Sequence, residues 1–261
     1  MHIPSPTNVI ITPLTDKLHS AKIEIFPLYP GYGHTVGNSL RRVLLSSLQG
    51  AGITSIRIQG ADHEFTTIPY VKEEVLEIIL NIKQLNITLH TDTKEKLTLH
   101  VKGKKTVTGV DFEKNPNIVI INPTQLIATL THKEAELEMT VTVEKGLGFS
   151  PVEEREKETE VGVISVDTTF SSIRSAGYVV EAIRVGKRTD YDKVILTVQT
   201  NGAIAAEVAL HRAASILVEQ FSSIVNQVAE KEDLPKELVP EEKAEAKEKK
   251  PRAKKKSKEK E

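Results

Sequence analysis

An alternating strand pattern and then a helical stripe mark the first part of the chain. Residues 20–27 alternate apolar with charged side chains, which is typical of a half-buried strand. Residues 35–48 carry apolar side chains at helical spacing, which predicts a helix capped by Thr35 and ended by Gly50. The stripe consists of Val36, Leu40, Val43, Leu44 and Leu48.

The middle of the chain changes from a helical to a strand pattern. A second helix is predicted over 71–84, with Val71, Val75, Ile78, Ile79 and Ile82 on one face. Strand patterns dominate from 86 to 144, including a predicted hairpin around Lys94–Lys96. A charged, Gly-containing loop over 145–160 separates this region from the last third of the chain.

The last third begins with strands and ends with a long helix. Strands are predicted over 161–167, 178–185 and 193–199, and a helix over 203–230. Three- and four-residue spacing along this helix is typical of a coiled-coil seam, made by Leu210, Ala214, Leu217, Phe221, Ile224 and Val228. Residues 231–261 consist mainly of Glu, Lys, Ala and Pro, which predicts disorder.

These patterns together indicate an α+β fold with two parts. Helical patterns stand at both ends of the chain and surround a strand-rich middle. The middle strands are able to form a sheet of their own, inserted into a first unit made of both ends. Periodicity does not decide this topology.

The composition excludes several kinds of functional site and is compatible with a cytoplasmic location. The 261 residues contain no Cys, which rules out disulfides, a thiol nucleophile and Cys-ligated metals. The absence of Cys permits a reducing cytoplasm, which is the expected compartment, and no apolar run approaches the length of a membrane span. The net charge of −1 conceals an asymmetry, because 231–261 hold 12 Lys and Arg against 9 Asp and Glu, leaving 23 against 27 in 1–230.

No set of residues predicts catalysis, a cofactor or a metal in this chain. The eight His are scattered, and no nucleophile elbow occurs. Residues 31–37 resemble a phosphate loop only loosely, so a tight turn is favoured there. Asp190-Tyr191-Asp192 suits either a metal or a hairpin turn, and the turn is favoured.

The adjacent arginines Arg41 and Arg42 are the most informative charged pair. Neighbours on a helix differ by about 100° in direction, so one is able to meet a partner while the other stays in solvent. The alternative is two ordinary surface arginines. Aromatic residues make up 4% of the chain and Trp is absent, which disfavours a base-stacking surface.

Long segments resemble the N-terminal region of bacterial RNA polymerase alpha subunits. The resemblance rests on residues 31–68, on VKEEVLEIILNIKQL at 71–85, on 176–202 with RVGKRTDYDKV, and on 206–224. It implies a discontinuous dimerisation domain, 1–49 with 162–230, and an inserted β-rich domain, 50–161. The family also implies a homodimer that scaffolds assembly of the beta and beta-prime subunits, which hold the catalytic site and its magnesium.

The resemblance also implies which residues meet which partner. The positions implied for beta are Arg41, Arg42, Leu45 and Lys83. The region implied for beta-prime contains Arg188, Asp190 and Lys193. The first and last helices are implied as the dimer interface, with Val36, Leu40, Leu210, Leu217, Phe221, Ile224 and Val228. As a polymerase subunit, the chain is expected at the nucleoid.

The carboxyl end departs from the family. Relatives usually continue into a small helical domain that binds upstream DNA, whereas this sequence stops at Glu261 after the basic segment 249–260. A lineage without that domain and a truncated sequence both stay open. The basic segment suits weak DNA binding through charge or a solubilising role. The main alternative function is a free-standing dimer that binds nucleic acid through this tail, and an independent enzyme is the weakest alternative.

Overall fold

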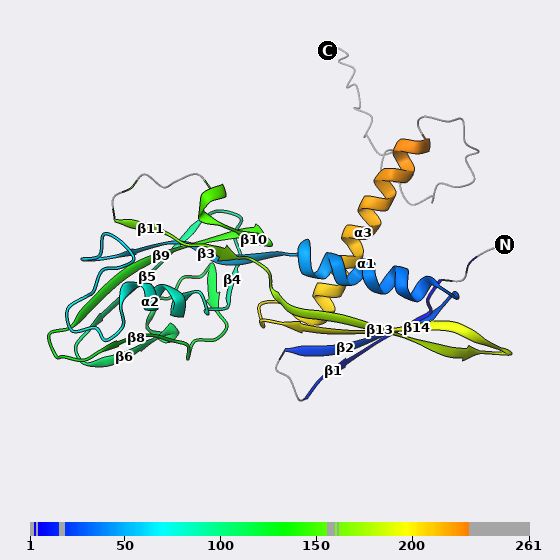
Figure 1. Cartoon of the computed structure of the whole chain (residues 1–261), viewed down its shortest axis with the longest axis horizontal. Coiled ribbons are helices and arrows are strands. Elements are labelled where there is room, and N and C mark those ends of the chain that lie inside the picture. Colours follow the sequence, from blue (N-terminus) through cyan, green and yellow to red (C-terminus); the bar gives the residue numbers. More distant parts are fainter. Residues whose placement is uncertain (1–2, 4, 16–18, 156–159, 161, 230–261) are drawn as a thin grey trace, which may run out of the picture. The chain divides into compact units, whose positions relative to one another are not determined.

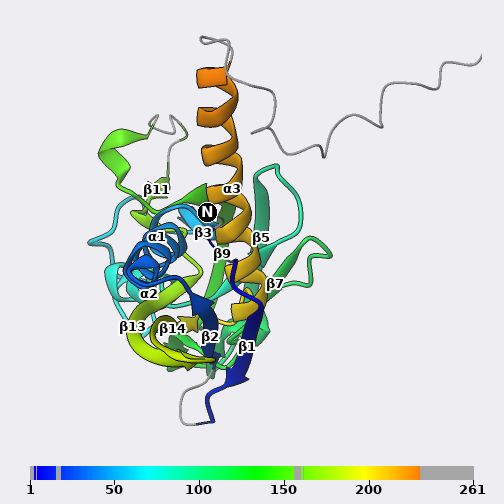
Figure 2. The same cartoon turned by 90° about the vertical axis from the view of Figure 1, so that its right-hand side faces the viewer.

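The computed structural model describes residues 3, 5–15, 19–155, 160 and 162–229. Residues up to Glu219 form one compact unit, and a second unit starts at Gln220. The second unit is described only over the last residues of a helix (Figures 1 and 2). The segment 231–261, with its basic stretch 249–260, lies outside the described residues.

A four-stranded antiparallel sheet combines two strands from the start of the chain with two strands that follow residue 172. Its strand order is β1-β2-β14-β13, with β1 at Asn8–Pro13, β2 at Ser20–Leu28, β13 at Ile173–Val185 and β14 at Arg188–Thr200. Ile23 lies opposite Leu196 in the register of β2 and β14, and both are buried. The alternation predicted for 20–27 is confirmed, because Ala21, Ile23 and Ile25 are buried.

Two helices pack their apolar residues into the same core as this sheet. Helix α1 spans Tyr32–Ser46 and helix α3 spans Ala206–Ala229. The shared cluster includes Leu40 and Leu44 from α1 and Ala209 and Ala213 from α3. Both helices are therefore confirmed, with α3 inside the predicted range 203–230.

The ends predicted for α1 were wrong. Gly31 in the left-handed conformation precedes the helix, so Thr35 lies inside it and does not cap it. Gly50 does not end the helix either, because it belongs to strand β3. A Cβ at Gly50 would lie 1.8 Å from the Phe170 carbonyl oxygen, so close backbone approach explains this glycine.

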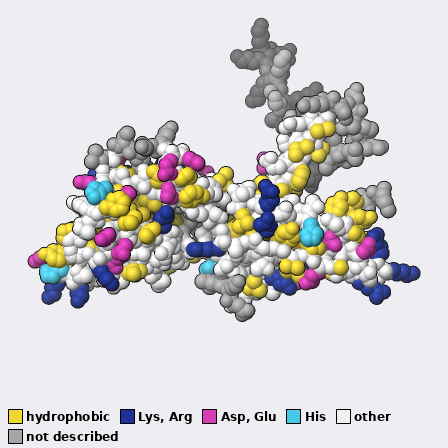
Figure 3. All heavy atoms as spheres, in the orientation of Figure 1, with side chains coloured by type: hydrophobic (Ala, Val, Ile, Leu, Met, Phe, Trp, Pro, Cys, Tyr) yellow, Lys and Arg dark blue, Asp and Glu magenta, His cyan; other side chains and the backbone are white. Residues whose placement is uncertain are grey.

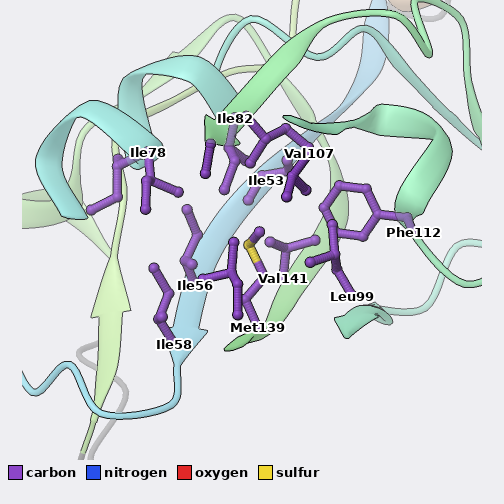
Figure 4. Close-up of a cluster of buried hydrophobic side chains, with 14 of the residues drawn as sticks. Ile53, Ile56, Ile58, Ile78, Ile82, Leu99, Val107, Phe112, Met139 and Val141 are labelled. Atoms are coloured by element: carbon purple, nitrogen blue, oxygen red, sulfur yellow. The ribbon is translucent and has the colours of Figure 1, made fainter. Parts of the chain in front are cut away.

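A second core is built around another four-stranded antiparallel sheet and helix α2. The strand order is β11-β3-β9-β5, with β3 at Gln49–Ile58, β5 at Glu95–Lys102, β9 at Glu136–Leu147 and β11 at Val163–Ser165. Helix α2, Val75–Ile82, buries its apolar face in this core. Figure 4 shows Ile78 and Ile82 beside residues of β3 and β9.

Shorter elements complete the second core. Strand β4, Ile87–Leu89, pairs with β7, Ile118–Ile120, and β6, Lys105–Thr108, pairs with β8, Leu126–Leu130. Strand β10, Phe149–Ser150, pairs with β12, Thr168–Thr169. Two 3₁₀ turns, η1 and η2, lie at Gly109–Asp111 and Val152–Glu154.

The second core corrects two predictions. The hairpin around Lys94–Lys96 was wrong, because β4 pairs with β7 while β5 pairs with β9. The helix predicted over 71–84 is shorter, because Val71 instead forms a bridge with Leu130. The α+β class is confirmed by three helices and mostly antiparallel sheets in the described part of the chain.

Among the described residues, no helix combines the length and the apolar character that crossing a membrane requires.

Candidate docking surfaces

Asp192 holds the amino end of α1 from a distant strand. Its Oδ2 accepts hydrogen bonds from the backbone N–H groups of Gly31 and Gly33, at 2.9 Å each. A register shift between Asp192 and Val194 interrupts the pairing of β14 with β2 at this point. The carboxylate thus satisfies two free donors at the positive end of a helix dipole.

Two glycines bring α1 close to β13 and β14. A Cβ at Gly33 would lie 2.6 Å from Val180 Cγ1, and one at Gly37 would lie 2.6 Å from Tyr178 Cδ2. Real Cβ atoms do not approach so closely, so both positions depend on glycine. The expected tight turn before the helix is therefore present, and a close helix–sheet contact extends beyond it.

The outer face of α1 carries the residues implied for beta. Arg42 and Leu45 are exposed, whereas Arg41 is half-buried and donates from Nη2 to Asn38 Oδ1 at 3.1 Å. Neither arginine forms an ion pair with a described residue. This face therefore presents a guanidinium group and a leucine one turn apart, a combination that suits protein contacts.

Lys83 lies on another element, directly after α2, and is exposed. Within the described residues, no hydrogen bond or ion pair connects it with Arg41, Arg42 or Leu45. Lys83 instead lines a cavity of about 310 Å³ together with Arg174. The sequence-predicted beta set therefore divides between α1 and the end of α2.

Arg188 and Asp190 form a paired group at the start of β14. Arg188 donates from Nε to Asp190 Oδ1 at 3.0 Å and from Nη2 to Oδ2 at 2.7 Å. The guanidinium lies over the rings of Tyr191, at 5.2 Å, and Tyr29, at 5.7 Å. This pairing lowers the pKa of the Asp190 carboxyl and raises the pKa of Arg188. Sequence reasoning missed Tyr29 because it is about 160 residues away along the chain.

The turn predicted at Asp190-Tyr191-Asp192 was wrong. These residues lie within β14, and the turn falls between Val185 and Arg188. Asp190 faces Arg188, whereas Asp192 faces the start of α1.

Lys193 belongs to a different group from Arg188 and Asp190. Its Nζ lies 2.7 Å from Glu24 Oε2, and Lys22 Nζ lies 2.7 Å from Glu24 Oε1. The hydrogen bonds from Lys193 and then Lys22 lower the pKa of Glu24. Lys193 also lies 5.4 Å from the centre of the Phe26 ring. The residues implied for beta-prime therefore form two neighbouring clusters on β14.

Sequence analysis also missed one group with metal-ligand chemistry. The ligand atoms of His100, Glu136 and Glu138 lie within 4.8 Å of one another on β5 and β9, and all three residues are exposed. His100 and Glu138 are register partners, so only the strand pairing brings them together. His100 Nε2 and Lys102 Nζ both lie within 3 Å of Glu136 Oε1, which satisfies this carboxylate without a metal.

The residues implied for the dimer interface differ in exposure. Leu40 is 6% exposed and packs into the core of its own chain, while Val36, Leu210 and Leu217 are half-buried. Within the second unit, Phe221 is 60% exposed, Ile224 58% and Val228 48%. Val218 and Val225 are exposed on the same stripe. Figure 3 shows apolar side chains at the surface of the last turns of α3.

The second half of α3 exposes a stripe of large apolar side chains. Its residues continue the spacing by which Leu210, Ala214 and Leu217 pack against the sheet. A continuous exposed apolar stripe of this kind marks an association surface.

Comparison with known proteins shows which proteins the chain is similar to. Residues 56–171 match the model of the RNA polymerase Rpb3/RpoA insert domain. The DNA-directed RNA polymerase subunit alpha of Lawsonia intracellularis is 47% identical over 206 residues, covering 78% of this chain and 59% of the relative. The subunit alpha of Maridesulfovibrio salexigens is 44% identical over 222 residues, which cover 85% of this chain and 64% of the relative. The subunit alpha of Symbiobacterium thermophilum is 46% identical over 206 residues, which cover 78% of this chain and 65% of the relative.

The matches define a class of RNA polymerase subunits that carry the Rpb3/RpoA insert domain. Within that class, the chain is similar to the alpha subunits of DNA-directed RNA polymerase, which confirms the resemblance found in the sequence. The chain spans less than two thirds of the length of these relatives.

Proposed function

We propose that the chain acts as the alpha subunit of a DNA-directed RNA polymerase, in which a homodimer scaffolds assembly of the beta and beta-prime subunits. The observation that carries this proposal is the exposed apolar stripe of α3, formed mainly by Phe221, Ile224 and Val228. An apolar stripe on a protein in solution is covered most economically by an identical stripe of a second copy. The relatives named as alpha subunits support the same proposal.

The proposed role is assembly and not catalysis. The described residues present surfaces with paired or exposed cations, and the polymerase chemistry belongs in this proposal to the large subunits. Such a subunit acts in the cytoplasm, at the nucleoid. The alternative of a free-standing nucleic-acid-binding dimer rests on residues 231–261, which lie outside the described part of the chain.

The two hydrophobic cores support the proposed domain division. One core contains buried residues between Ile53 and Val166. The other combines residues from Ile23 to Leu48 with residues from Ile173 to Ala213. In the proposal, the first core belongs to an inserted domain, 50–161, and the second to a dimerisation domain, 1–49 with 162–230. Ile164 and Val166 lie beyond residue 161 but are buried in the first core, where β11 pairs with β3.

In the proposed assembly, beta docks on α1 through Arg41, Arg42 and Leu45, with Lys83 contributing from α2. Beta-prime docks near Arg188, Asp190 and Lys193.

The test is capture of purified beta by the dimer of the full chain. Arg42→Ala is expected to leave the dimer folded and to weaken capture by about 2–5 kcal/mol, because an interfacial cation removed from a buried pair leaves its partner unpaired.

Arg57→Ala is the matched control, because Arg57 is also exposed but lies on β3. It is expected to capture beta as well as the wild type. Equal capture by wild type and Arg42→Ala would contradict the role given to Arg42. A wild-type dimer that captures no beta would contradict the proposed function.

A further inference from the structure

A cavity of about 860 Å³ is lined by residues of α3, of β4 and of the start of β3. Its wall includes residues of both hydrophobic cores, such as Leu48 from the core that contains α1 and Leu89 from the core that contains α2. All of the lining residues belong to the first unit. Cavities of this volume hold small organic ligands in many proteins. The cavity therefore has the size of a ligand site.

Two hydroxyl groups in the wall of this cavity have no hydrogen-bond partner among the described residues. Thr88 Oγ1 is buried and unpaired. Ser172 is 5% exposed, and its Oγ takes part in no hydrogen bond within the described part of the chain. A Cβ at Gly50, another lining residue, would lie 2.9 Å from this Oγ, so the hydroxyl stands beside the backbone of β3. Buried hydroxyls are normally paired, so these two are groups able to bind a ligand.

Two cations and one carboxylate line the same cavity. Arg212 is exposed on α3 and forms no ion pair with a described residue. Lys145 is half-buried on β9, and its Nζ lies 2.6 Å from Oδ1 of Asp92, whose side chain is 91% exposed. An ion pair with so exposed a partner contributes little, so Lys145 is able to bind another anion. Since Glu219 is the one carboxylate of the lining, the charges favour an anionic ligand.

The charged residues that α3 contributes to the cavity lie on the side of the helix opposite its apolar stripe. Arg212 is two residues from Leu210, and Glu219 is two residues from Phe221. Two residues turn by about 200° around a helix, so Arg212 and Glu219 point away from the stripe. In the proposed dimer the stripe is covered while these two residues stay on the other side of α3.

We propose that this cavity binds a small molecule that carries a phosphate group, with Arg212 and Lys145 balancing its charge and the hydroxyls of Thr88 and Ser172 donating to its oxygens. The acceptor oxygens of a phosphate point in several directions, which suits donors on separate elements, and guanidinium groups bind phosphate well. A metal ion fits poorly, because the lining contains one carboxylate. This inference goes beyond the proposed assembly and does not depend on it.

The test is isothermal titration calorimetry of the full-length chain with inorganic phosphate, glycerol phosphate or acetate at equal ionic strength. The variants are Arg212→Gln and Ser172→Ala. Arg57→Gln is the matched control for the arginine, because Arg57 is exposed on β3 and does not line the cavity. Ser175→Ala is the matched control for the serine, because Ser175 is an exposed residue of β13. Thermal unfolding without ligand checks that each variant folds.

We expect phosphate and glycerol phosphate to bind once per copy of the chain, and acetate to bind at least about tenfold more weakly. Arg212→Gln and Ser172→Ala should each raise the dissociation constant for phosphate by about tenfold, with both controls unchanged. Without ligand, Ser172→Ala should unfold at the wild-type temperature or above it, because the lost hydroxyl has no partner in the chain. Tighter binding of glycerol phosphate would identify an ester as the ligand and equal binding the free ion, and both results support the site.

A wild-type chain that binds neither phosphate probe would overturn this inference. Binding that either variant retains at wild-type strength would overturn it as well, because the phosphate would then lie elsewhere. Acetate binding as strong as phosphate binding would identify a general anion site and contradict the choice of phosphate. Capture of beta is measured separately, so each of these failures leaves the proposed function intact.

Discussion

Asp192 shows how a single residue sets the position of a proposed docking surface that does not include it. Its carboxylate receives the first free N–H groups of α1, and the glycine at 33 leaves the room that it needs. Arg42 and Leu45 lie further along the same helix. The placement of these exposed side chains thus depends on an acceptor about 150 residues away in the sequence.

Replacing Asp192 by Ala is expected to lower the free energy of unfolding by about 1–2 kcal/mol, since two N–H groups at a helix end lose their acceptor. Hydrogen exchange should accelerate most at the amides of Gly31 and Gly33, as followed by NMR. Asp190→Ala on the same strand serves as the control, with little effect on these amides. Unchanged exchange in Asp192→Ala would show that the carboxylate does not hold α1.

The ion cluster at Glu24 predicts a specific response to acid. Lys193 and Lys22 lower its pKa below the ordinary value of 4.5, so the folded state favours the ionised carboxyl. The resulting stabilisation is present above the ordinary pKa and is lost as the pH falls through the lowered value. Urea unfolding between about pH 6 and about pH 3 should therefore show a shallower loss of stability in Glu24→Gln than in the wild type.

Glu153→Gln is the control for that comparison, because Glu153 is exposed and forms no ion pair with another described residue. Its pH dependence is expected to follow the wild type. Parallel curves for wild type and Glu24→Gln would mean that the cluster contributes nothing to the acid response.

At the scale of elements, α3 serves two purposes along one stripe. Leu210 and Leu217 pack into the core of the first unit, whereas Phe221, Ile224 and Val228 expose the same kind of side chain. The continuous spacing across this change supports the proposed dimer, in which an identical stripe covers the second half of the helix.

Phe221→Glu is expected to disrupt the proposed dimer, because a carboxylate would be buried without a partner between apolar side chains. Sedimentation should show the dissociation constant rising by about 100-fold or more. The control is Ser223→Glu, which adds the same charge to an exposed position away from the stripe. A full dimer in Phe221→Glu at the same concentration would place the interface elsewhere.

Elements with strong internal periodicity were predictable, whereas their partners were not. The alternation in β2 and the stripes of α1 and α3 are local patterns, and all three elements are present. The false hairpin around Lys94–Lys96 arose because its polar turn looks like a hairpin turn, although β9 and β7 supply the actual partners.

The candidate surfaces show the same division. The pairing of Arg188 with Asp190 lies within three residues, so a local pattern contains it. The ring of Tyr29, directly after β2, meets that guanidinium only after β2 and β14 pair. Contacts of this kind are set by strand register, which a single sequence does not specify.

At the scale of the whole molecule, the proposed assembly explains how a symmetric dimer supports two different large subunits. Each copy carries both the α1 surface and the β14 surface, so the free dimer offers two of each. Docking of one beta subunit removes the equivalence of the copies, and beta-prime then meets a dimer that is no longer symmetric. Such an assembly needs dimerisation residues that both copies use and docking residues that differ for beta and beta-prime.

Strand β14 contains Arg188 and Asp190 at its start and Asp192 two residues later. A mutational scan through these positions therefore has an ambiguous readout, since a defect at one of them does not identify which large subunit lost its contact. Alanine at 192 alters the platform of α1, while alanine at 188 alters a local charge pair. Scans of this segment become interpretable only when capture of beta and of beta-prime is measured for every variant.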